Sequence, residues 1–179
     1  IYFAVTVSRD NRIGLDAYLR MEGMVLRLEP NKDPQVVSGT DSYGMNPVRT
    51  EFSLDSVYNI RNLLDQEVYK DDNMLKLISN YRSAYLQLAS DYSEDGRYDQ
   101  AVGALDKLEE RLPLDWRSSY SAATIARRGG PRMEDVSERF ARLSGELLDR
   151  EIRQASELGM FQMEMVRRTA QILRYSNAS

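Results

Sequence analysis

The chain has 179 residues, 42% hydrophobic and 29% charged, which suits one folded domain and argues against intrinsic disorder. It carries 24 Lys and Arg against 28 Asp and Glu, a net charge of −4, so no overall basic field draws in nucleic acid or anionic lipid. The absence of cysteine excludes disulfides and thiolate chemistry, and the absence of histidine removes the commonest general base and zinc ligand.

The N-terminal third predicts a small strand–helix–strand segment followed by a loop. Residues 1–8 are β-branched and aromatic, which is typical of a strand. Apolar residues at helical spacing over 13–22, stopped by Gly23, predict a short helix, and 24–28 predict a second strand that pairs in parallel with the first. Residues 30–53 are rich in proline and glycine, which predicts a plain connector, with a binding loop as the alternative.

From residue 54 onward, apolar residues recur every three or four positions, which is the pattern of helices packed on a core. The chain therefore divides into an N-terminal segment, 1–53, and a helical domain, 54–179, and the fold class is mainly α. The predicted helices cover 55–64, a run from an Asp71 or Asp72 cap to Gly96, 98–113, 116–126, a long run through Ile152, and 160–175.

One set of residues in the second and third of these helices has a specific spacing. It comprises Tyr85, Leu88, Ala89, Tyr92, Gly96, Tyr98, Ala101, Leu105, Leu108 and Pro113. The spacing resembles the tetratricopeptide repeat of about 34 residues. Small Ala89 and Ala101 suit the close approach of two antiparallel helices, Gly96 suits the tight turn between them, and Pro113 ends the second helix. The sequence thus predicts a tetratricopeptide-like helical hairpin.

A weaker copy of the pattern follows, with a longer turn and with Val136 where the first copy has a small residue. Its members are Tyr120, Ala123, Thr124, Gly130, Val136, Phe140 and Leu143. A stack of repeats needs several units to bury a continuous core, so we expect the flanking helices to act as partial repeats or caps.

Four residues are candidates for a binding surface: Tyr81, Arg82, Arg127 and Arg128. A tyrosine among others at helical spacing suits an aromatic groove, but core packing explains it as well. Arginines before a Gly-Gly-Pro turn suit an anion site, or simply the favourable basic end of a helix. The adjacent Asp71 and Asp72 suit a helix cap better than a catalytic carboxylate pair.

Several segments together resemble one known family. They are the runs Ile1–Val7 and Tyr18–Gly23, then Asn80–Arg82, with Leu88–Ala89 and Gly96 beyond. In these residues the chain resembles the C-terminal region of a bacterial multi-pass membrane-protein family whose membrane part is similar to protein O-mannosyltransferases. The resemblance implies a tail beyond the last membrane span, on the periplasmic side, with the catalytic residues in the membrane part and none here.

The leading hypothesis is therefore a non-catalytic domain that binds a protein or peptide, or braces the membrane part of its own parent chain. It needs no cofactor and no metal, does not bind nucleic acid, and lies on the extracytoplasmic side without inserting into the membrane. The start at Ile1 rather than Met fits a piece of a longer protein. The alternatives are a stand-alone carboxylate enzyme acting on glycans and a purely structural or oligomerisation domain.

Overall fold

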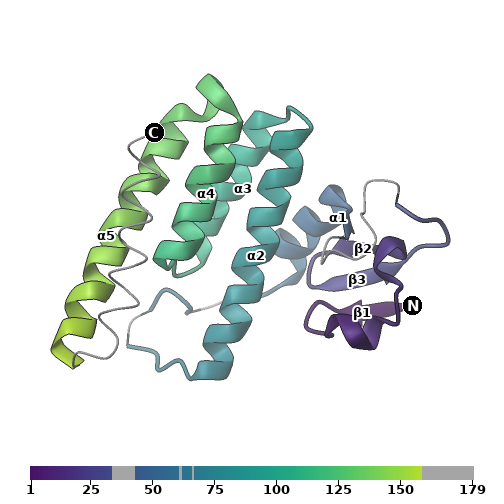
Figure 1. Ribbon diagram of the computed structural model, residues 1–179, viewed down its shortest axis with the longest axis horizontal. Helices are drawn as coiled ribbons and strands as arrows, with labels where there is room; N and C mark the ends of the chain where they lie inside the picture. The colour runs from purple at the N-terminus through teal and green to yellow at the C-terminus, as the bar shows by residue number, and fades with distance from the viewer. Residues whose placement is uncertain (34–42, 61, 66, 159–179) are drawn as a thin grey trace.

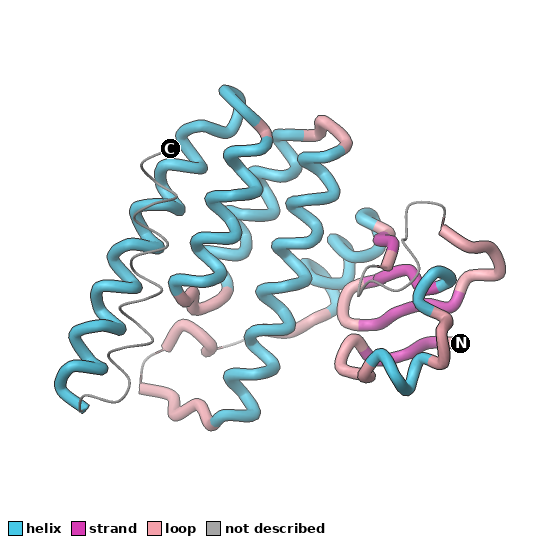
Figure 2. Tube along the Cα trace, in the orientation of Figure 1, coloured by secondary structure: helices cyan, strands magenta, loops and turns pink. Residues whose placement is uncertain are grey.

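The computed structural model describes residues 1–33, 43–60, 62–65 and 67–158. Within this part the chain is mainly helical, with a small sheet near the N-terminus, as the sequence predicts. The long helices stand side by side at one end of the molecule, and the sheet lies at the other end (Figure 1, Figure 2). The helix predicted over 160–175 lies outside the described residues.

The small sheet has the order β1-β3-β2-β4. Its strands are β1 (Tyr2–Ala4), β2 (Leu19–Glu22), β3 (Val25–Leu28) and β4 (Gly44–Met45). β3 runs antiparallel to both neighbours, so that Leu26 lies opposite Phe3 on one side and Met21 on the other, while β4 is parallel to β2. The predicted parallel pairing of residues 1–8 with 24–28 is therefore wrong. β1 and β3 lie in these segments and run antiparallel, because the chain between them forms the additional strand β2.

The helix predicted over 13–22 is also wrong. The structure has short 3-10 turns at Arg9–Arg12 and Asp16–Tyr18, and then β2. In β2 the buried Leu19 and Met21 alternate with exposed Arg20, which is the two-residue period of a strand with one covered face. Over a few residues this alternation is hard to distinguish from a helical face.

Gly23 marks the hairpin turn between β2 and β3 rather than the end of a helix. Its φ is +70°, in the left-handed region. A Cβ at this position would meet the Tyr58 hydroxyl at 2.7 Å and the Ser53 Cβ at 2.8 Å. Both the turn and the close packing therefore require glycine here.

Part of the predicted 30–53 loop is ordered into regular structure. After β4, Pro47–Phe52 forms α1, with proline at the first helical position and the Asn46 side chain accepting a hydrogen bond from the Arg49 N–H at 3.2 Å. The plain loop is thus wrong for these residues, and 34–42 lie outside the described part of the chain.

The helix predicted over 55–64 is wrong beyond its first turn. Ser53–Val57 forms one π-helical turn, and Tyr58 is already extended. Asn62 has a φ of +57°, which a continuous helix does not allow. The apolar side chains that suggested a helix, Tyr58, Ile60 and Leu63, pack against the core from an irregular segment.

The helices from residue 72 onward are confirmed. They are α2 (Asp72–Glu94), α3 (Tyr98–Arg111), α4 (Trp116–Arg128) and α5 (Glu134–Leu158), with a 3-10 turn at Gly130–Met133. Asp71 caps α2 by accepting from the Met74 N–H at 2.8 Å, and Asp115 with Ser118 forms a capping box at α4. Gly96, with a φ of +74°, makes the turn between α2 and α3.

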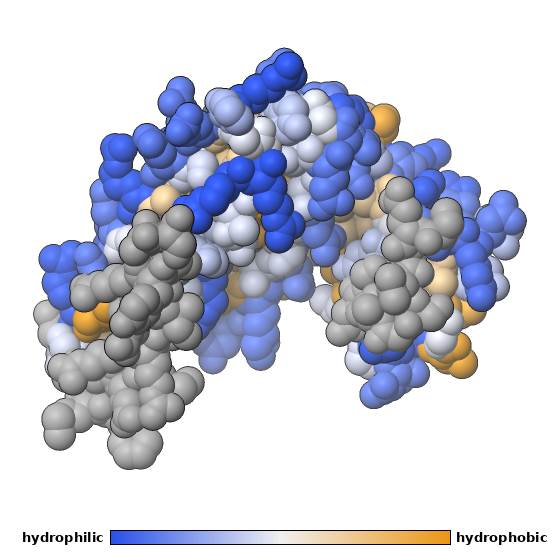
Figure 3. All heavy atoms as spheres, turned by 45° about the horizontal axis from the view of Figure 1, so that its top comes forward, coloured by the Kyte–Doolittle hydropathy of each residue, from blue (hydrophilic) through white to orange (hydrophobic). Residues whose placement is uncertain are grey.

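These helices pack as two antiparallel pairs, α2 with α3 and α4 with α5, joined mainly through α2 and α4 (Figure 1). Their shared core contains the fully buried Tyr85, Tyr92 and Phe140. Ala89 and Ala101 are both 0% exposed, on helices that pack together, as the close-approach prediction requires. Hydrophilic side chains cover most of the visible outer face of the helices (Figure 3). In the described part of the chain, no helix has the length and apolar character needed to span a membrane.

Ala101→Leu should destabilise the protein by about 1–3 kcal/mol, because the larger side chain overpacks a site with no free space. Thermal and urea unfolding measure the change. Gly103→Ala is the matched control on the same helix, since nothing lies within 4 Å of the added Cβ. It should be neutral or stabilise by about 0.5–1 kcal/mol. An unchanged melting temperature for Ala101→Leu would contradict close packing at this residue.

Candidate functional site

The densest group of titratable side chains lies where α1 and the 53–57 turn meet α2 and α3. We call it the polar clamp and define it by Glu51, Asp55, Tyr85, Tyr92, Lys107 and Arg111. The Lys107 ammonium donates to Asp55 at 2.5 Å and to Glu51 at 3.2 Å. The Tyr92 hydroxyl donates to Glu51 at 2.6 Å, and Arg111 donates to the Tyr85 hydroxyl at 2.8 Å and to the Leu54 carbonyl at 2.7 Å.

The pKa shifts in the polar clamp follow from these bonds. Burial raises the pKa of Glu51, but hydrogen bonds from Tyr92 and Lys107 outweigh it and hold the pKa below its usual value of 4.5. The hydrogen bond to Asp55 is the main cause that raises the pKa of Lys107. Burial raises the pKa of Tyr85 to about 12. Tyr85 is therefore neutral, and Glu51 and Lys107 are charged, at neutral pH.

Each of the six side chains already has a partner within the clamp, so its charges are compensated in place. The clamp joins α1 and the following turn to the α2–α3 pair. Among the described residues, no three acidic side chains gather closely enough to hold a metal ion.

The residues of the repeat pattern lie in the core rather than on a binding surface. Tyr85, Leu88, Ala89, Tyr92, Ala101, Leu105 and Leu108 are all buried. Tyr98 and Pro113 are half-buried, and Gly96 sits at the turn. The pattern therefore describes how the helices pack.

A second set of buried side chains follows the first at a constant interval of 34 residues. Ser119, Ala122, Ala123 and Ala126 in α4 are buried and stand in the places of Tyr85, Leu88, Ala89 and Tyr92. In α5 the small buried residue is Ser137, whose hydroxyl donates to the Ala123 carbonyl at 3.1 Å, and not the neighbouring Val136. Relative to the register suggested from Tyr120 and Val136, the buried residues therefore lie one position earlier in α4, and Ser137 lies one position later in α5.

The structure does not bring the four candidate surface residues together. Tyr81 is half-buried and packs edge-on against Tyr58, with ring centres 5.7 Å apart. Arg82 is buried and donates to the Pro113 carbonyl and to Asp115, both at 2.6 Å. Arg127 and Arg128 are exposed at the other end of α4, about 17 Å along that helix from Asp115.

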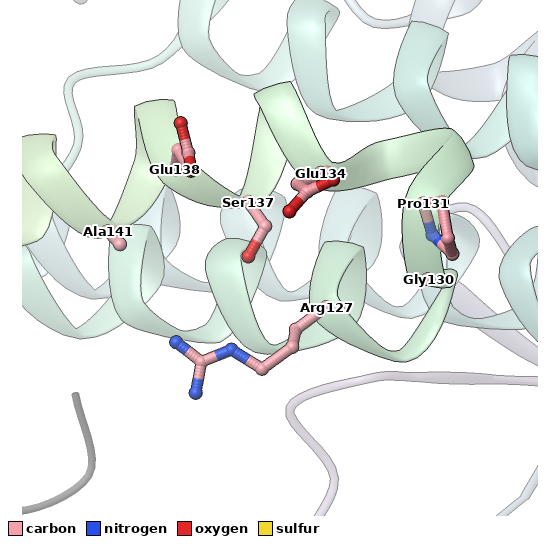
Figure 4. A pocket seen from close by; sticks show the side chains of 7 residues that line it. All are labelled: Arg127, Gly130, Pro131, Glu134, Ser137, Glu138 and Ala141. Atoms are coloured by element: carbon pink, nitrogen blue, oxygen red, sulfur yellow. The ribbon is translucent and has the colours of Figure 1, made fainter. Parts of the chain in front are cut away.

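Arg127 borders a cleft of about 390 Å³ between the end of α4 and the start of α5. Glu134 and Ser137 also line it, and Figure 4 shows the Arg127 side chain extending along α4 with its guanidinium group turned away from Glu134. The Ser137 hydroxyl is engaged with the helix backbone. The cleft therefore combines one cation and exposed carboxylates without a convergent polar set that selects one ligand.

A smaller cleft, of about 180 Å³, lies between the 59–63 segment and the first turns of α2. Ile60, Leu63, Met74, Leu77 and Tyr81 line it. The helical spacing in the sequence predicts Met74 and Leu77 as part of the apolar face that packs on the core. The length of the apolar run could have indicated this cleft. The run in α2 is much longer than that in its partner helix α3, so some turns of α2 have no partner turn in α3.

Comparison of the chain with protein-family models, with curated proteins and with solved structures found no match.

Acidification should weaken the polar clamp. Because the folded-state pKa of Glu51 is lowered, its contribution to stability is present above about pH 4.5 and is lost as the pH falls through the folded-state pKa. The urea midpoint of the wild-type chain should fall between about pH 5 and pH 3. Glu51→Gln should flatten part of this fall, leaving the share due to Asp115, whose pKa is also lowered, mainly by bonds with Ser118 that outweigh burial. Glu110→Gln, at an exposed position on α3, is the control and should leave the fall unchanged.

Proposed function

We propose that this chain is a non-catalytic interaction domain that binds or braces a protein partner. The proposal rests on one contrast. The clustered charged side chains are bonded to one another, whereas apolar side chains line a cleft that is open to solvent. The polar clamp and the Arg82–Asp115 pair are satisfied internally. Met74 and Leu77, by contrast, line an open cleft and remain exposed. Exposed apolar surface of this kind is typical of binding rather than of chemistry.

We also propose that the two helix pairs are successive tetratricopeptide-like units. The constant interval of 34 residues between the two buried sets, the small side chains at both helix crossings and the contact between α2 and α4 support this. In such an arrangement each unit presents its first helix beside that of the next. The result is a rigid surface of α2 and α4 suited to holding an extended or helical peptide segment.

The larger context that we propose is a membrane protein with a glycosyltransferase-like membrane part, of which this chain is the extracytoplasmic tail. The support is the resemblance of Ile1–Val7, Tyr18–Gly23 and Asn80–Arg82 to the corresponding tail segments of that family. A tethered interaction domain would raise the effective concentration of an acceptor protein near the membrane site, to about the millimolar range for a short tether.

Assays of the purified chain for peptide binding and for hydrolysis distinguish an interaction domain from an enzyme. We expect no hydrolysis of glycosides or peptides, and saturable binding of peptides selected from a random-peptide display library. Asp71→Asn and Asp72→Asn are the variants to compare, because these adjacent acids are the strongest catalytic pair that the sequence offers. Saturable turnover that either variant abolishes would replace the interaction domain by an enzyme. Failure to select any saturable peptide would also count against the proposal.

The membrane context is tested on the gene. We expect the coding sequence upstream of Ile1 to encode a span of about 20 apolar residues. In the parent protein, deletion of residues 54–179 should then reduce acceptor modification and leave binding of the lipid-linked donor unchanged. A start codon or a soluble domain directly upstream would contradict the membrane assignment, and would leave the interaction domain standing.

A further inference from the structure

The first turns of α2 extend past the helices that cover the rest of it. Arg82 is level with the end of α3, since it bonds to Pro113 and Asp115 just beyond Arg111. Residues 72–81 therefore project beyond the α2–α3 pair, and Figure 1 shows the N-terminal end of α2 extending below α3 and α4. Among the described residues, the irregular stretches 58–60 and 62–65 lie beside these turns, as the lining of the 180 Å³ cleft shows.

That segment covers one side of the projecting turns and leaves the other side open. Ile78 is 2% exposed, whereas Leu75 and Leu77 are 46% and 53% exposed. Leu64 and Val68 of the neighbouring segment are exposed as well. We call the 180 Å³ cleft, with the exposed Met74 and Leu77 in its lining, the α2 foot, and Leu64, Val68 and Leu75 are exposed apolar residues close to it in the chain. An apolar area of this kind with a polar rim marks an interaction site.

The rim of the α2 foot is acidic. Asp65, Glu67, Asp71 and Asp72 are all exposed. The Lys70 ammonium is held by the backbone carbonyls of Asp65 at 2.5 Å and Val68 at 3.1 Å. Residues 60–78 carry four carboxylates against three cations, Arg61, Lys70 and Lys76. Among the described residues of this stretch, all four carboxylates are exposed, whereas Lys76 is exposed and Lys70 is half-buried.

We propose that the α2 foot docks an amphipathic helical segment of another protein, with leucine-like side chains on one face and lysine or arginine beside them. This inference rests on the proposed interaction function and assigns its surface and partner class. The partner's apolar side chains would enter the cleft between Leu63 and Leu77, in the manner of a helix in a groove. Its basic side chains would meet Asp65, Glu67 and Asp72 at the rim.

The negative charge of the rim favours a basic helix over the two other partners that an apolar area could bind, a second copy of the chain and an anionic lipid surface. A second copy docked foot to foot would bring two acidic rims together, and like charges in contact oppose association. An anionic lipid surface would be repelled by the same carboxylates. A basic amphipathic helix is complementary to both features of the foot. One helix docked into a single small cleft makes a small interface, so we expect binding in the micromolar range that weakens with salt.

The test uses fluorescence anisotropy with the 179-residue chain and two labelled helical peptides of about 15 residues, or about four helical turns. Both carry leucine at the same helical positions, and the remaining positions are lysine in one and glutamate in the other. The leucine–lysine peptide should bind at least about tenfold more tightly at low salt. Equal affinity for the two peptides would overturn the proposal.

Two pairs of variants separate the foot from the rest of the surface. Leu77→Ser should weaken binding of the leucine–lysine peptide about tenfold, whereas Val48→Ser, at a somewhat more exposed apolar residue on α1, should not. Asp72→Lys should weaken it about five- to tenfold, whereas Asp99→Lys, also in the first turn of a helix and with the same change of net charge, should not. Melting curves of the four variants confirm that each is folded.

The remaining outcomes are also decisive. Peptide binding that survives Leu77→Ser would overturn the foot as the docking surface, while leaving the interaction function intact. A chain dimer in sedimentation equilibrium that Leu77→Ser dissociates would make a second copy the occupant and overturn the basic partner. Leucine-dependent cosedimentation of the chain with vesicles of anionic phospholipid would do the same in favour of a membrane. A monomeric chain that ignores vesicles and binds the basic peptide through Leu77 supports the proposal.

Discussion

Small side chains where the helices cross set the spacing on which the rest of this structure depends. Ala89 and Ala101 let α2 and α3 approach closely, and Ala122 and Ala123 do the same on α4. With the backbones this near, the remaining space is filled by Tyr85, Tyr92, Phe140 and other large side chains at crystal-like density. The hydroxyls of the two tyrosines then reach the edge of the core at the depth where the polar clamp can use them.

The helical half was predictable because its information is local. Apolar residues recur at the helical period, and the ends are marked by a cap at Asp71 and a left-handed turn at Gly96. The N-terminal half was not, because its strands are two to four residues long and its pairings join distant segments. Gly23 was correctly recognised as an end, but a helix stop and a hairpin turn both favour glycine. Only the pairing of Met21 with Leu26 decides between them.

The candidate sites divide in the same way, into features that local sequence patterns indicate and contacts between residues far apart in the sequence. Lys107 meets Glu51 across 56 residues of sequence, so no local pattern indicates the polar clamp. Arg82 was a candidate for a binding surface, but it is buried. Its partners, the Pro113 carbonyl and the Asp115 cap, become neighbours only on folding. The apolar run of α2 was visible in the sequence, but periodicity shows which side chains share a face and not how far the partner helix extends. The open end at Leu75 and Leu77 is a property of mismatched helix lengths.

Hydrogen bonds and apolar packing attach the sheet to the helices, and that attachment makes the two parts cooperative. The Thr50 hydroxyl donates to the Met21 carbonyl at 3.2 Å and accepts from the Gly23 N–H at 3.0 Å. Beside it, the Tyr58 hydroxyl accepts from the Met24 N–H at 2.9 Å while its ring packs on Tyr81 of α2. Strands this short have little stability of their own. Exchange of the Gly23 and Met24 amide hydrogens with solvent therefore requires their release from Thr50 of α1 and from Tyr58, so contacts with the helical part protect a hairpin turn that lies at the other end of the molecule.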